Sequence, residues 1–397
     1  MNILLKSCTN GNFGDDLFII SILDRYASEN RGFDILVYER EKYTFLEKKY
    51  PNINLIEYPI PNIVYRGLAA FQNKICKSNR IKKKTYEKIY ETIFSREYDA
   101  FINIGGSLMA CYETDTFVLG NWIEELFANK IRAKKKYLLN INLGFGTTAK
   151  FLNDCVNIFL KYDDVCFRDE YSYKIFSGIV PCRIAPDVVL NWALELDKNK
   201  NCKANKTIGI NIINLTENKR MYSQRREYIN SYEKKIVDIA SFYIDNNYRV
   251  LLFGFDDRLA ERTYIELVEK LIREKNIQNR NNINIEYIDY SFSKYEIVLN
   301  RIRECDLFVS TRFHAMVLAM SFGIPVFPIA YDEKIKNFME YIGANDKVIN
   351  IKDIDSVDPS NLEFAQIGFL ANKEEWPERL RDNAFRMLDK QLMKGYA

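Results

Sequence analysis

The sequence has 397 residues but a single histidine, His314, and this scarcity excludes more than any other count. A catalytic scheme that needs two histidines is impossible, and so are the common zinc sites built on a histidine pair. Glycine (16) and proline (9) are also scarce, which excludes a collagen-like or linker-like chain. Hydrophobic residues make up 47%, so the chain is not disordered.

A basic excess, the usual mark of a nucleic-acid-binding protein, is missing as well. Lys and Arg number 57 against 54 Asp and Glu, a net charge of +3, and we predict no nucleic-acid partner. Residues 1–6 contain too short an apolar run for a signal peptide. The eight cysteines show no CxxC spacing, so we interpret them as reduced, mostly buried thiols of a cytoplasmic protein.

One run, residues 313–331, is long and apolar enough to imitate a membrane span. It contains His314, Gly323, Pro325 and Pro328, and its Gly-Ile-Pro segment divides it into two halves. We therefore predict a buried helix followed by a buried parallel strand.

Short β-branched segments alternate with helical patterns along the chain, which predicts βαβ units and mostly parallel sheets. The predicted strands are residues 2–6, 34–38, 52–57, 99–104, 136–143, 164–167, 181–184, 207–213, 248–254, 283–290, 306–310 and 325–330. Helical patterns include residues 16–28 and 116–130, whereas residues 191–206 lose periodicity and become polar, which indicates a linker. We predict an α/β fold of two Rossmann-like domains with a cleft between them. The predicted domains are 1–195 and 207–375, and a closing helix in 376–397 can pack back on the N-terminal domain.

Ligands of such sheets bind beyond the carboxyl ends of the strands, so loops at strand ends are the candidate site. Six of the sixteen glycines lie there in three pairs, and turns alone would not demand pairing each time. The pairs and their polar neighbours are Gly11-Asn12-Phe13-Gly14-Asp15-Asp16, Gly105-Gly106-Ser107 and Gly144-Phe145-Gly146. Asp15 or Asp16 is placed to cap the following helix, which leaves the other as a base toward a hydroxyl.

Two further strand ends carry charge. Arg168-Asp169 follows the strand 164–167, where the arginine either reaches an anion in the cleft or forms a structural Arg–Asp pair. Pro186-Asp187 has the same two interpretations.

The segment that contains Ser310, Arg312 and His314 joins a predicted strand end to a predicted helix N-terminus, a place that favours an anion. Arginine offers a two-pronged donor to carboxylate or phosphate, and histidine is the side chain best suited to move a proton near neutral pH. The structural alternative is that Arg312 pairs with a carboxylate such as Asp306 and only holds the loop.

These motifs, taken in order from residue 11 to residue 334, resemble the polysaccharide pyruvyl transferase family. The resemblance rests on Gly11-Asn-x-Gly-Asp-Asp, Gly105-Gly106, Arg168-Asp169-x-x-Ser172, Pro186-Asp187, Ser310-x-Arg312-x-His314, Ala319-x-x-x-Gly323-x-Pro325 and Tyr331-x-x-Lys334. There are two departures: Ser107 stands where a third glycine often follows, and Gly144-x-Gly146 lacks a following proline.

The resemblance implies a GT-B-like architecture and transfer of the pyruvyl group of phosphoenolpyruvate to a sugar of a glycan or glycolipid precursor, forming a cyclic ketal and releasing phosphate. Phosphoenolpyruvate is then a donor substrate, and we predict no cofactor and no metal. His314 suits the general acid, Asp15 or Asp16 the base, and Arg312, Arg168 and Lys334 the anionic groups of the donor. The other implied binding residues are Gly11, Asn12, Gly14, Gly105, Gly106, Ser107, Asp169, Ser310 and Tyr331.

Two alternatives stay open at this point: a GT-B nucleotide-sugar glycosyltransferase, and a non-catalytic sugar-binding protein of the same fold. The acceptor is expected on the N-terminal domain and phosphoenolpyruvate on the C-terminal one. Two basic runs, residues 74–88 and 130–136, are interpreted as solvated helix faces and loops. Their alternative is a peripheral contact with an anionic membrane surface, which would suit a lipid-linked acceptor.

Overall fold

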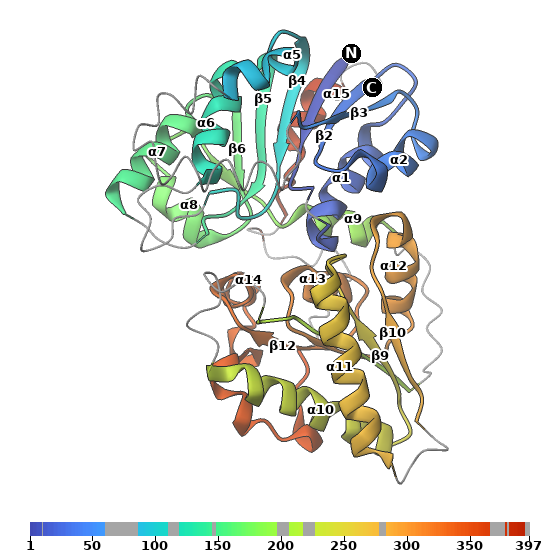
Figure 1. Cartoon of the computed structure of the whole chain (residues 1–397). Coiled ribbons are helices and arrows are strands. Elements are labelled where there is room, and N and C mark those ends of the chain that lie inside the picture. Colours follow the sequence, from blue (N-terminus) through green and yellow to red (C-terminus); the bar gives the residue numbers. More distant parts are fainter. Residues whose placement is uncertain are drawn as a thin grey trace, which may run out of the picture. The chain divides into compact units, whose positions relative to one another are not determined.

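The computed structural model describes residues 1–9, 11–59, 86–109, 119–144, 148–196, 206–216, 227–277, 283–365, 378 and 381–393. The chain forms two α/β units (Figure 1). Unit 1 comprises Met1–Asn10, Asp15–Val188 and Asp382–Ala397, and unit 2 comprises Gly11–Gly14 and Val189–Arg381. The structure thus groups residues 11–14 and 189–195, which the sequence predicts in the first domain, with unit 2. Which unit takes which substrate stays a prediction.

The described part of unit 1 contains a parallel sheet with the strand order β3-β2-β1-β4-β5-β6-β7. Strand β1 lies inside the sheet, with Ile3 opposite Phe33 of β2 on one side and Ala100 of β4 on the other. The strands are β1 (Asn2–Lys6), β2 (Gly32–Val37), β3 (Ile53–Glu57), β4 (Glu97–Ile104), β5 (Arg132–Ile141), β6 (Asp164–Phe167) and β7 (Arg183–Ile184). The helices are α1 (Phe13–Tyr26), α2 (Arg40–Lys49), α5 (Glu91–Phe94), α6 (Leu119–Lys130), α7 (Ala149–Phe159), α8 (Glu170–Phe176) and α15 (Arg386–Leu392).

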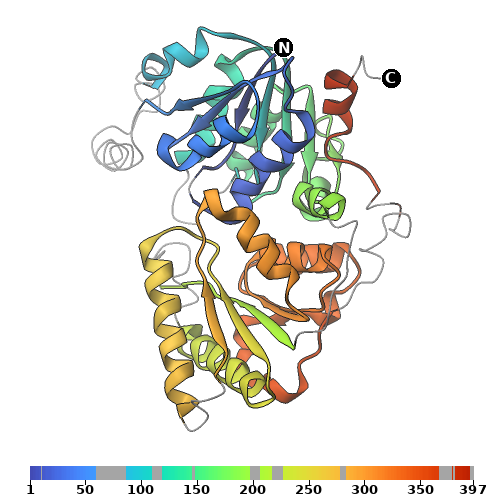
Figure 2. The same ribbon diagram turned by 90° about the vertical axis from the view of Figure 1, so that its right-hand side faces the viewer.

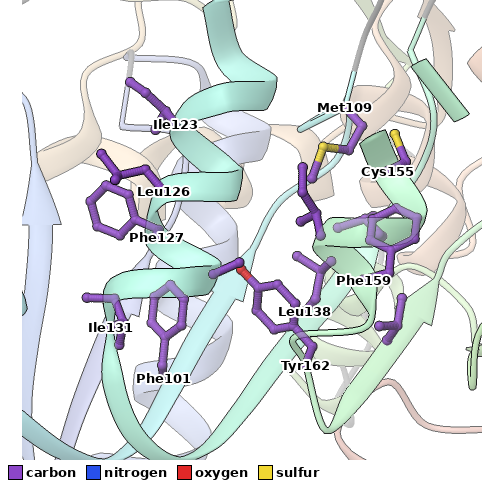
Figure 3. Packing of buried hydrophobic residues seen from close by; sticks show 14 of the residues in the cluster. Phe101, Met109, Ile123, Leu126, Phe127, Ile131, Leu138, Cys155, Phe159 and Tyr162 are labelled. Carbon is purple, nitrogen blue, oxygen red and sulfur yellow. The ribbon is translucent and has the colours of Figure 1, made fainter. Parts of the chain in front are cut away.

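Aromatic side chains fill the core between the sheet and α6 and α7 (Figure 3). The ring of Phe101 on β4 stacks on those of Phe127 and Tyr162, with centroids 6.4 and 6.1 Å apart. Both faces of the central strands are buried, which explains why their sequences are continuous apolar runs rather than alternating ones.

The C-terminal helix α15 lies beside the sheet of unit 1 (Figure 2). Arg25 on α1 donates two hydrogen bonds to the carboxylate of Asp389, at 3.0 and 2.9 Å, and the Tyr26 hydroxyl donates a third at 2.6 Å. The predicted closing helix is shorter than expected, because within residues 381–393 the chain is helical only over Arg386–Leu392.

The described part of unit 2 contains a second parallel sheet, with the order β10-β9-β8-β11-β12-β13. Its strands are β8 (Thr207–Asn211), β9 (Arg249–Phe253), β10 (Ile285–Ile288), β11 (Leu307–Ser310), β12 (Val326–Ala330) and β13 (Ile349–Asn350). Its helices are α9 (Val188–Leu196, whose first residue belongs to unit 1), α10 (Ile229–Asp245), α11 (Leu259–Lys275), α12 (Tyr295–Arg303), α13 (Phe313–Ser321) and α14 (Glu333–Tyr341). In each sheet the order in which successive strands are added reverses once, between β1 and β4 in unit 1 and between β8 and β11 in unit 2. Such switch points are where doubly wound sheets bind ligands.

The run 313–331 folds as predicted, as the buried helix α13 and the buried strand β12. Gly323 ends the helix with a positive φ of 67°, a conformation that glycine adopts at little cost. Across the described residues, no helix combines the length and the apolar character that a membrane crossing would require.

The predicted linker 191–206 is wrong over its first part, since residues 191–196 lie in helix α9. That helix is apolar on nearly every side and buried, so its sequence shows no amphipathic period. Residues 197–205 lie outside the described residues, as do most of the basic run 74–88 and residues 145–147 of the third glycine pair.

The basic run 130–136 lies mainly on β5 rather than on a helix face or loop. Carboxylates pair with its side chains: Lys134 with Asp99 and Lys135 with Asp163, both at 2.7 Å. This pairing reduces the positive charge that the run could offer an anionic surface. Of the cysteines in the described part, Cys155, Cys166 and Cys305 are buried, and Cys8 and Cys182 are partly buried.

Candidate functional site

The switch point of unit 2 holds the Ser310–His314 segment. Ser310 ends β11, and its hydroxyl donates to the carbonyl oxygen of Arg312 at 2.9 Å. The Arg312 N–H donates to the side-chain oxygen of Asn211, the last residue of β8, also at 2.9 Å. These bonds hold Arg312 in the extended conformation that precedes helix α13. As predicted, the segment joins a strand end to a helix N-terminus.

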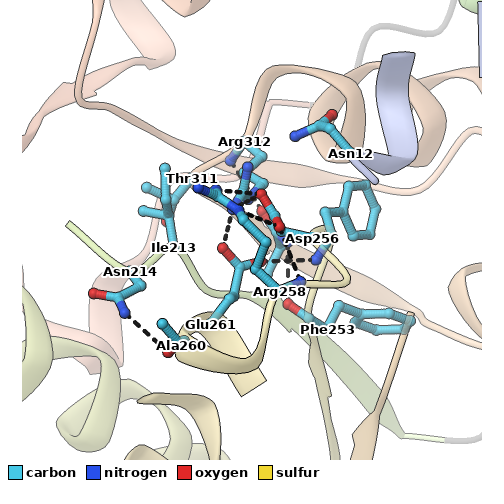
Figure 4. Close-up of polar contacts among 12 residues, drawn as sticks. Asn12, Ile213, Asn214, Phe253, Asp256, Arg258, Ala260, Glu261, Thr311 and Arg312 are labelled. Atoms are coloured by element: carbon cyan, nitrogen blue, oxygen red, sulfur yellow. Dashed lines mark hydrogen bonds and ion pairs between the residues drawn. The ribbon is translucent and has the colours of Figure 1, made fainter. Parts of the chain in front are cut away.

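The Arg312 side chain forms an ion pair with Glu261 of α11 (Figure 4). Glu261 is only 1% exposed and also accepts a hydrogen bond from the Phe255 N–H at 3.0 Å. Burial raises the pKa of Glu261, and the guanidinium of Arg312 opposes that rise. Arg312 thus pairs with a carboxylate, as the structural alternative predicts, and the partner is Glu261. The Asp306 carboxylate, given as an example from the sequence, accepts a hydrogen bond from the Thr207 N–H at 2.9 Å.

A second arginine and a second carboxylate extend this pair (Figure 4). Asp256 accepts hydrogen bonds from the backbone N–H and the Nε of Arg258, at 3.1 and 2.6 Å, and its Oδ2 lies 3.9 Å from Nη2 of Arg312. Sequence reasoning missed Asp256, Arg258 and Glu261. A signal was present for the first two, since Asp256-Asp257-Arg258 begins two residues after the end of the predicted strand 248–254.

The glycine segment 11–14 pairs with the loop after β9. The Phe13 N–H donates to the Phe255 carbonyl and the Asp257 N–H to the Gly11 carbonyl, both at 2.9 Å. Gly11 has a φ of +73°, and a β-carbon added to it would overlap the Asp257 carboxylate, so glycine is required there. The sequence assigns this segment to the acceptor domain, whereas its backbone pairing places it in unit 2.

Asn12 serves as the cap of α1, because its side-chain oxygen accepts a hydrogen bond from the Gly14 N–H at 3.1 Å. This corrects the prediction that Asp15 or Asp16 caps the helix; the helix begins at Phe13, which places both carboxylates inside its first turn. There the negative charges of the two carboxylates interact favourably with the positive end of the helix dipole.

His314 is the second residue of α13 and is half-buried. Its imidazole contacts the ring of Phe313 edge-on, with centroids 5.1 Å apart. On another side it lies against Gly14, where an added β-carbon would overlap the ring. The structure thus brings together Gly14 and His314, two residues that are 300 positions apart in the sequence.

Tyr331 and Lys334 follow β12, the strand next to β11, and therefore lie at the same sheet edge as Arg312 and His314. Both side chains are half-buried. Between them, Asp332 caps α14 by accepting a hydrogen bond from the Lys334 N–H at 3.1 Å.

The two candidate bases lie in unit 1 and differ in burial. Asp16 is fully buried and accepts a hydrogen bond from the Tyr43 hydroxyl at 2.8 Å. Asp15 is half-buried, and its carbonyl oxygen accepts a hydrogen bond from the Ser7 hydroxyl at 3.4 Å. Of the two carboxylates, Asp15 is the one with access to solvent.

Arg168 forms a buried Arg–Asp pair, the structural alternative of the sequence analysis, and its partner is Asp187 rather than the adjacent Asp169. It is 5% exposed and pairs with Asp187 at 2.8 Å, while Asn142 accepts hydrogen bonds from its Nε and Nη2 at 3.0 and 2.8 Å. Gly106 is needed for this arrangement, since an added β-carbon would lie 2.5 Å from Nη2 of Arg168. Ser107 joins the cluster, because its hydroxyl accepts a hydrogen bond from the Asn142 amide at 3.1 Å.

The neighbouring Asp169 caps helix α8. Its carboxylate accepts hydrogen bonds from the Ser172 N–H and hydroxyl, at 2.7 and 2.9 Å, and burial raises its pKa. Gly105 lies in the same strand-end loop as Gly106, where an added β-carbon would meet the Leu108 side chain at 3.2 Å. Substrate contacts by Gly105, Gly106, Ser107, Arg168 and Asp169 stay predictions.

The switch point of unit 1 contains a buried ion pair that sequence reasoning missed. Lys6 at the end of β1 pairs with Glu124 of α6 at 2.5 Å, and the amide of Asn103 on β4 donates to Glu124 at 2.7 Å. Within the described residues, no group of three or more His, Cys, Asp or Glu side chains is placed to hold a metal ion.

The two doubly wound units define a GT-B-like α/β fold. Residues 12–333 match the polysaccharide pyruvyl transferase family, and the chain therefore belongs to this family of transferases. A curated relative, the amylovoran biosynthesis protein AmsJ of Erwinia amylovora, is 22% identical over 423 residues, which cover 94% of this chain and 92% of the relative.

Solved structures show the same fold. The UDP-GlcNAc 2-epimerase from Neisseria meningitidis, bound to UDP-GlcNAc, is 14% identical with a TM-score of 0.53, and the match covers all of both chains. The UDP-GlcNAc 2-epimerase from Methanocaldococcus jannaschii, in complex with UDP-GlcNAc and UDP, is 12% identical with a TM-score of 0.54 over 99% of both chains. At this identity the likeness concerns the fold alone.

Proposed function

We propose that this transferase moves the pyruvyl group of phosphoenolpyruvate onto two hydroxyls of a sugar in a glycan or glycolipid precursor, forming a cyclic ketal and releasing phosphate. Family membership supports pyruvyl transfer to a polysaccharide. The observation that carries the donor assignment is the junction of β11 and α13, which places Arg312 and His314 at the carboxyl edge of a parallel sheet. Lys334 adds a cation at the same edge.

This edge of unit 2 suits a donor with two anionic groups. Phosphoenolpyruvate carries a carboxylate and a phosphate, and the N-terminus of α13 favours negative charge. The planar guanidinium of Arg312 carries five N–H donors, a geometry that matches a carboxylate or a phosphate. Glu261 and Asn211 hold Arg312 in place before the donor arrives, so that little ordering is needed on binding.

The proposed reaction balances with these groups. The imidazolium of His314 gives its proton to the methylene carbon, which becomes the methyl group, and the adjacent carbon becomes an electrophile. One sugar hydroxyl adds to that carbon and loses its proton to a base, for which Asp15 is the candidate. The second hydroxyl then displaces phosphate by breaking the carbon–oxygen bond. Asp15 then gives its proton to the departing phosphate, and the proton of the second hydroxyl restores His314.

Two measurements test this proposal. Phosphoenolpyruvate should raise the melting temperature of the protein by mass action, whereas UDP should not. Phosphate release from phosphoenolpyruvate should then depend on a glycan acceptor, measured with a panel of acceptors. Stabilisation by UDP with no response to phosphoenolpyruvate would favour a nucleotide-sugar glycosyltransferase, and a response to neither would favour a non-catalytic sugar-binding protein.

A further inference from the structure

Gly14 occupies a position whose backbone does not call for glycine. It is the second residue of helix α1 and has helical geometry. Alanine is the better helix former, because glycine loses more backbone entropy when it is ordered. The reason for glycine at this position therefore has to come from the space around its α-carbon.

The imidazole of His314 fills that space. The three atoms nearest to an added β-carbon are Nδ1, Cγ and Cε1 of His314, and Nδ1 is the nearest. The ring therefore presents its Nδ1 side to the backbone of segment 11–14. Nε2 is not among these three atoms.

Segment 11–14 is itself held firmly. The ring of Phe13 packs between Phe255 and Tyr290, with centroids 4.6 and 4.9 Å away, and is fully buried. Asn12 caps the helix and forms an antiparallel bridge with Asp256. Segment 11–14 therefore offers the His314 ring a rigid surface to pack against.

We propose that Gly14 is a positioning residue, which seats the His314 imidazole with Nδ1 against segment 11–14 so that Nε2 is the atom that delivers the proton to the donor. This assignment rests on the proposed function for its chemical step. The position of the His314 ring against segment 11–14 does not depend on that step and can be measured without substrate.

The first test is Gly14→Ala in the full chain. A displacement of a catalytic group by about 1 Å can cost about 10²-fold in rate, so kcat should fall by about that factor. The KM for phosphoenolpyruvate should change much less, because Arg312 and Lys334 are untouched. Gly32→Ala is the matched control, since its added β-carbon would meet neighbours only at 3.5 and 3.9 Å; its kcat should equal that of the wild type.

The second test uses the fact that the chain has one histidine. With ¹⁵N-histidine labelling, the NMR spectrum contains a single imidazole, whose two nitrogen shifts report its tautomer and surroundings. Gly14→Ala should move both shifts in the absence of substrate, whereas Gly32→Ala should move neither. Unchanged imidazole shifts in Gly14→Ala would overturn the proposal. Wild-type protein inactive toward phosphoenolpyruvate would instead refute the proposed function and leave the seating supported.

A double-mutant cycle covers the case in which Gly14→Ala folds poorly. In a His314→Ala background the overlap is relieved, so Gly14→Ala should then be neutral or stabilising in thermal unfolding. Equal destabilisation by Gly14→Ala in both backgrounds would show that the glycine serves something other than His314.

Discussion

The sheet of unit 2 has the strand order of the first six strands in the sheet of unit 1, and both switch points hold a buried ion pair, but the two pairs have different neighbours. In unit 1 the ends of β1 and β4 meet a buried ion pair, Lys6 with Glu124, whose charges neutralise each other away from solvent. In unit 2 the ends of β8 and β11 hold an equally buried carboxylate, Glu261, but the cation it pairs with lies beside the half-buried His314. The fold therefore supplies a place for chemistry in both units, and the side chains decide whether it is used.

Glycine shows the same contrast at a finer scale. Gly106 in unit 1 makes room for Arg168, whose charge is matched by the buried carboxylate of Asp187. Gly14 in unit 2 makes room for His314, whose ring is half-buried. In both units the missing β-carbon admits a nitrogen-bearing side chain; in unit 1 the result is a structural cluster, and in unit 2 it is a candidate catalytic group.

Replacing His314 should have the largest effect and tests whether unit 2 carries the chemistry. His314→Ala should lower kcat by about 10²–10⁴-fold, the usual contribution of a general acid, because the sequence contains no second histidine to replace it. Phosphate release measures the loss, and circular dichroism with thermal unfolding checks that the fold is kept. Near-normal turnover by the folded variant would remove His314 from the mechanism.

In unit 1, removing the carboxylate that pairs with Arg168 should lower the free energy of unfolding rather than the rate of turnover. Asp187→Ala leaves the guanidinium of Arg168 buried without its carboxylate, which costs about 3–5 kcal/mol. Denaturant unfolding measures this cost. Asp289→Ala is the control, because its ion pair with Arg262 is partly exposed, and ion pairs near the surface contribute about 1 kcal/mol or less. If Asp187→Ala unfolds like the wild type but loses activity, the contrast between the units is wrong.

The adjacent carboxylates Asp15 and Asp16 sharpen the comparison within one helix turn. Asp15→Asn should lower kcat by about 10²-fold if Asp15 is the base, with little change in unfolding. Asp16→Asn should cost about 1 kcal/mol in stability, because the charged acceptor of the buried Tyr43 hydroxyl is lost, and should leave kcat nearly unchanged. Reversed results would make the buried carboxylate the base.

Much of this fold can be predicted from the sequence, because parallel strands buried on both faces form continuous apolar runs between helical periods. Helix α9 could not, since a helix that is buried on nearly every side has no polar face to set its period. The start of β5 could not be predicted either, because the exposed first half of this strand has the composition of a basic loop. The carboxylates that pair with its lysines come from elsewhere in the sequence, from β4 and from the segment before β6.

The candidate site could be predicted only where its residues follow strand ends. That rule finds Ser310, Arg312 and His314, but it cannot say which carboxylate Arg312 meets, because Glu261 lies in the first turn of another helix, α11, far from Arg312 in the sequence. Nor can it place segment 11–14, whose assignment to unit 2 depends on backbone pairing with residues 255–257 rather than on its own side chains. Long-range pairing of this kind leaves no local signal in a single sequence.

Among the changes that should slow turnover, Arg312→Lys should have the smallest effect, and it separates the two roles that the arginine could combine. Lysine keeps the charge and can still pair with Glu261, but it replaces a planar fork by a point charge. Losing one charge-assisted hydrogen bond to the donor costs about 1.5–3 kcal/mol, so kcat/KM for phosphoenolpyruvate should fall at least about tenfold while the melting temperature changes little.

Arg258→Lys is the matched control, because Arg258 belongs to the same cluster through Asp256 but its side chain is half exposed. It should change neither kcat/KM nor the melting temperature appreciably. A variant of Arg312 that unfolds at lower temperature yet keeps its kinetics would show that the guanidinium only ties α11 to the start of α13. The donor would then have to bind elsewhere, and the two switch points would no longer differ in the way that their side chains indicate.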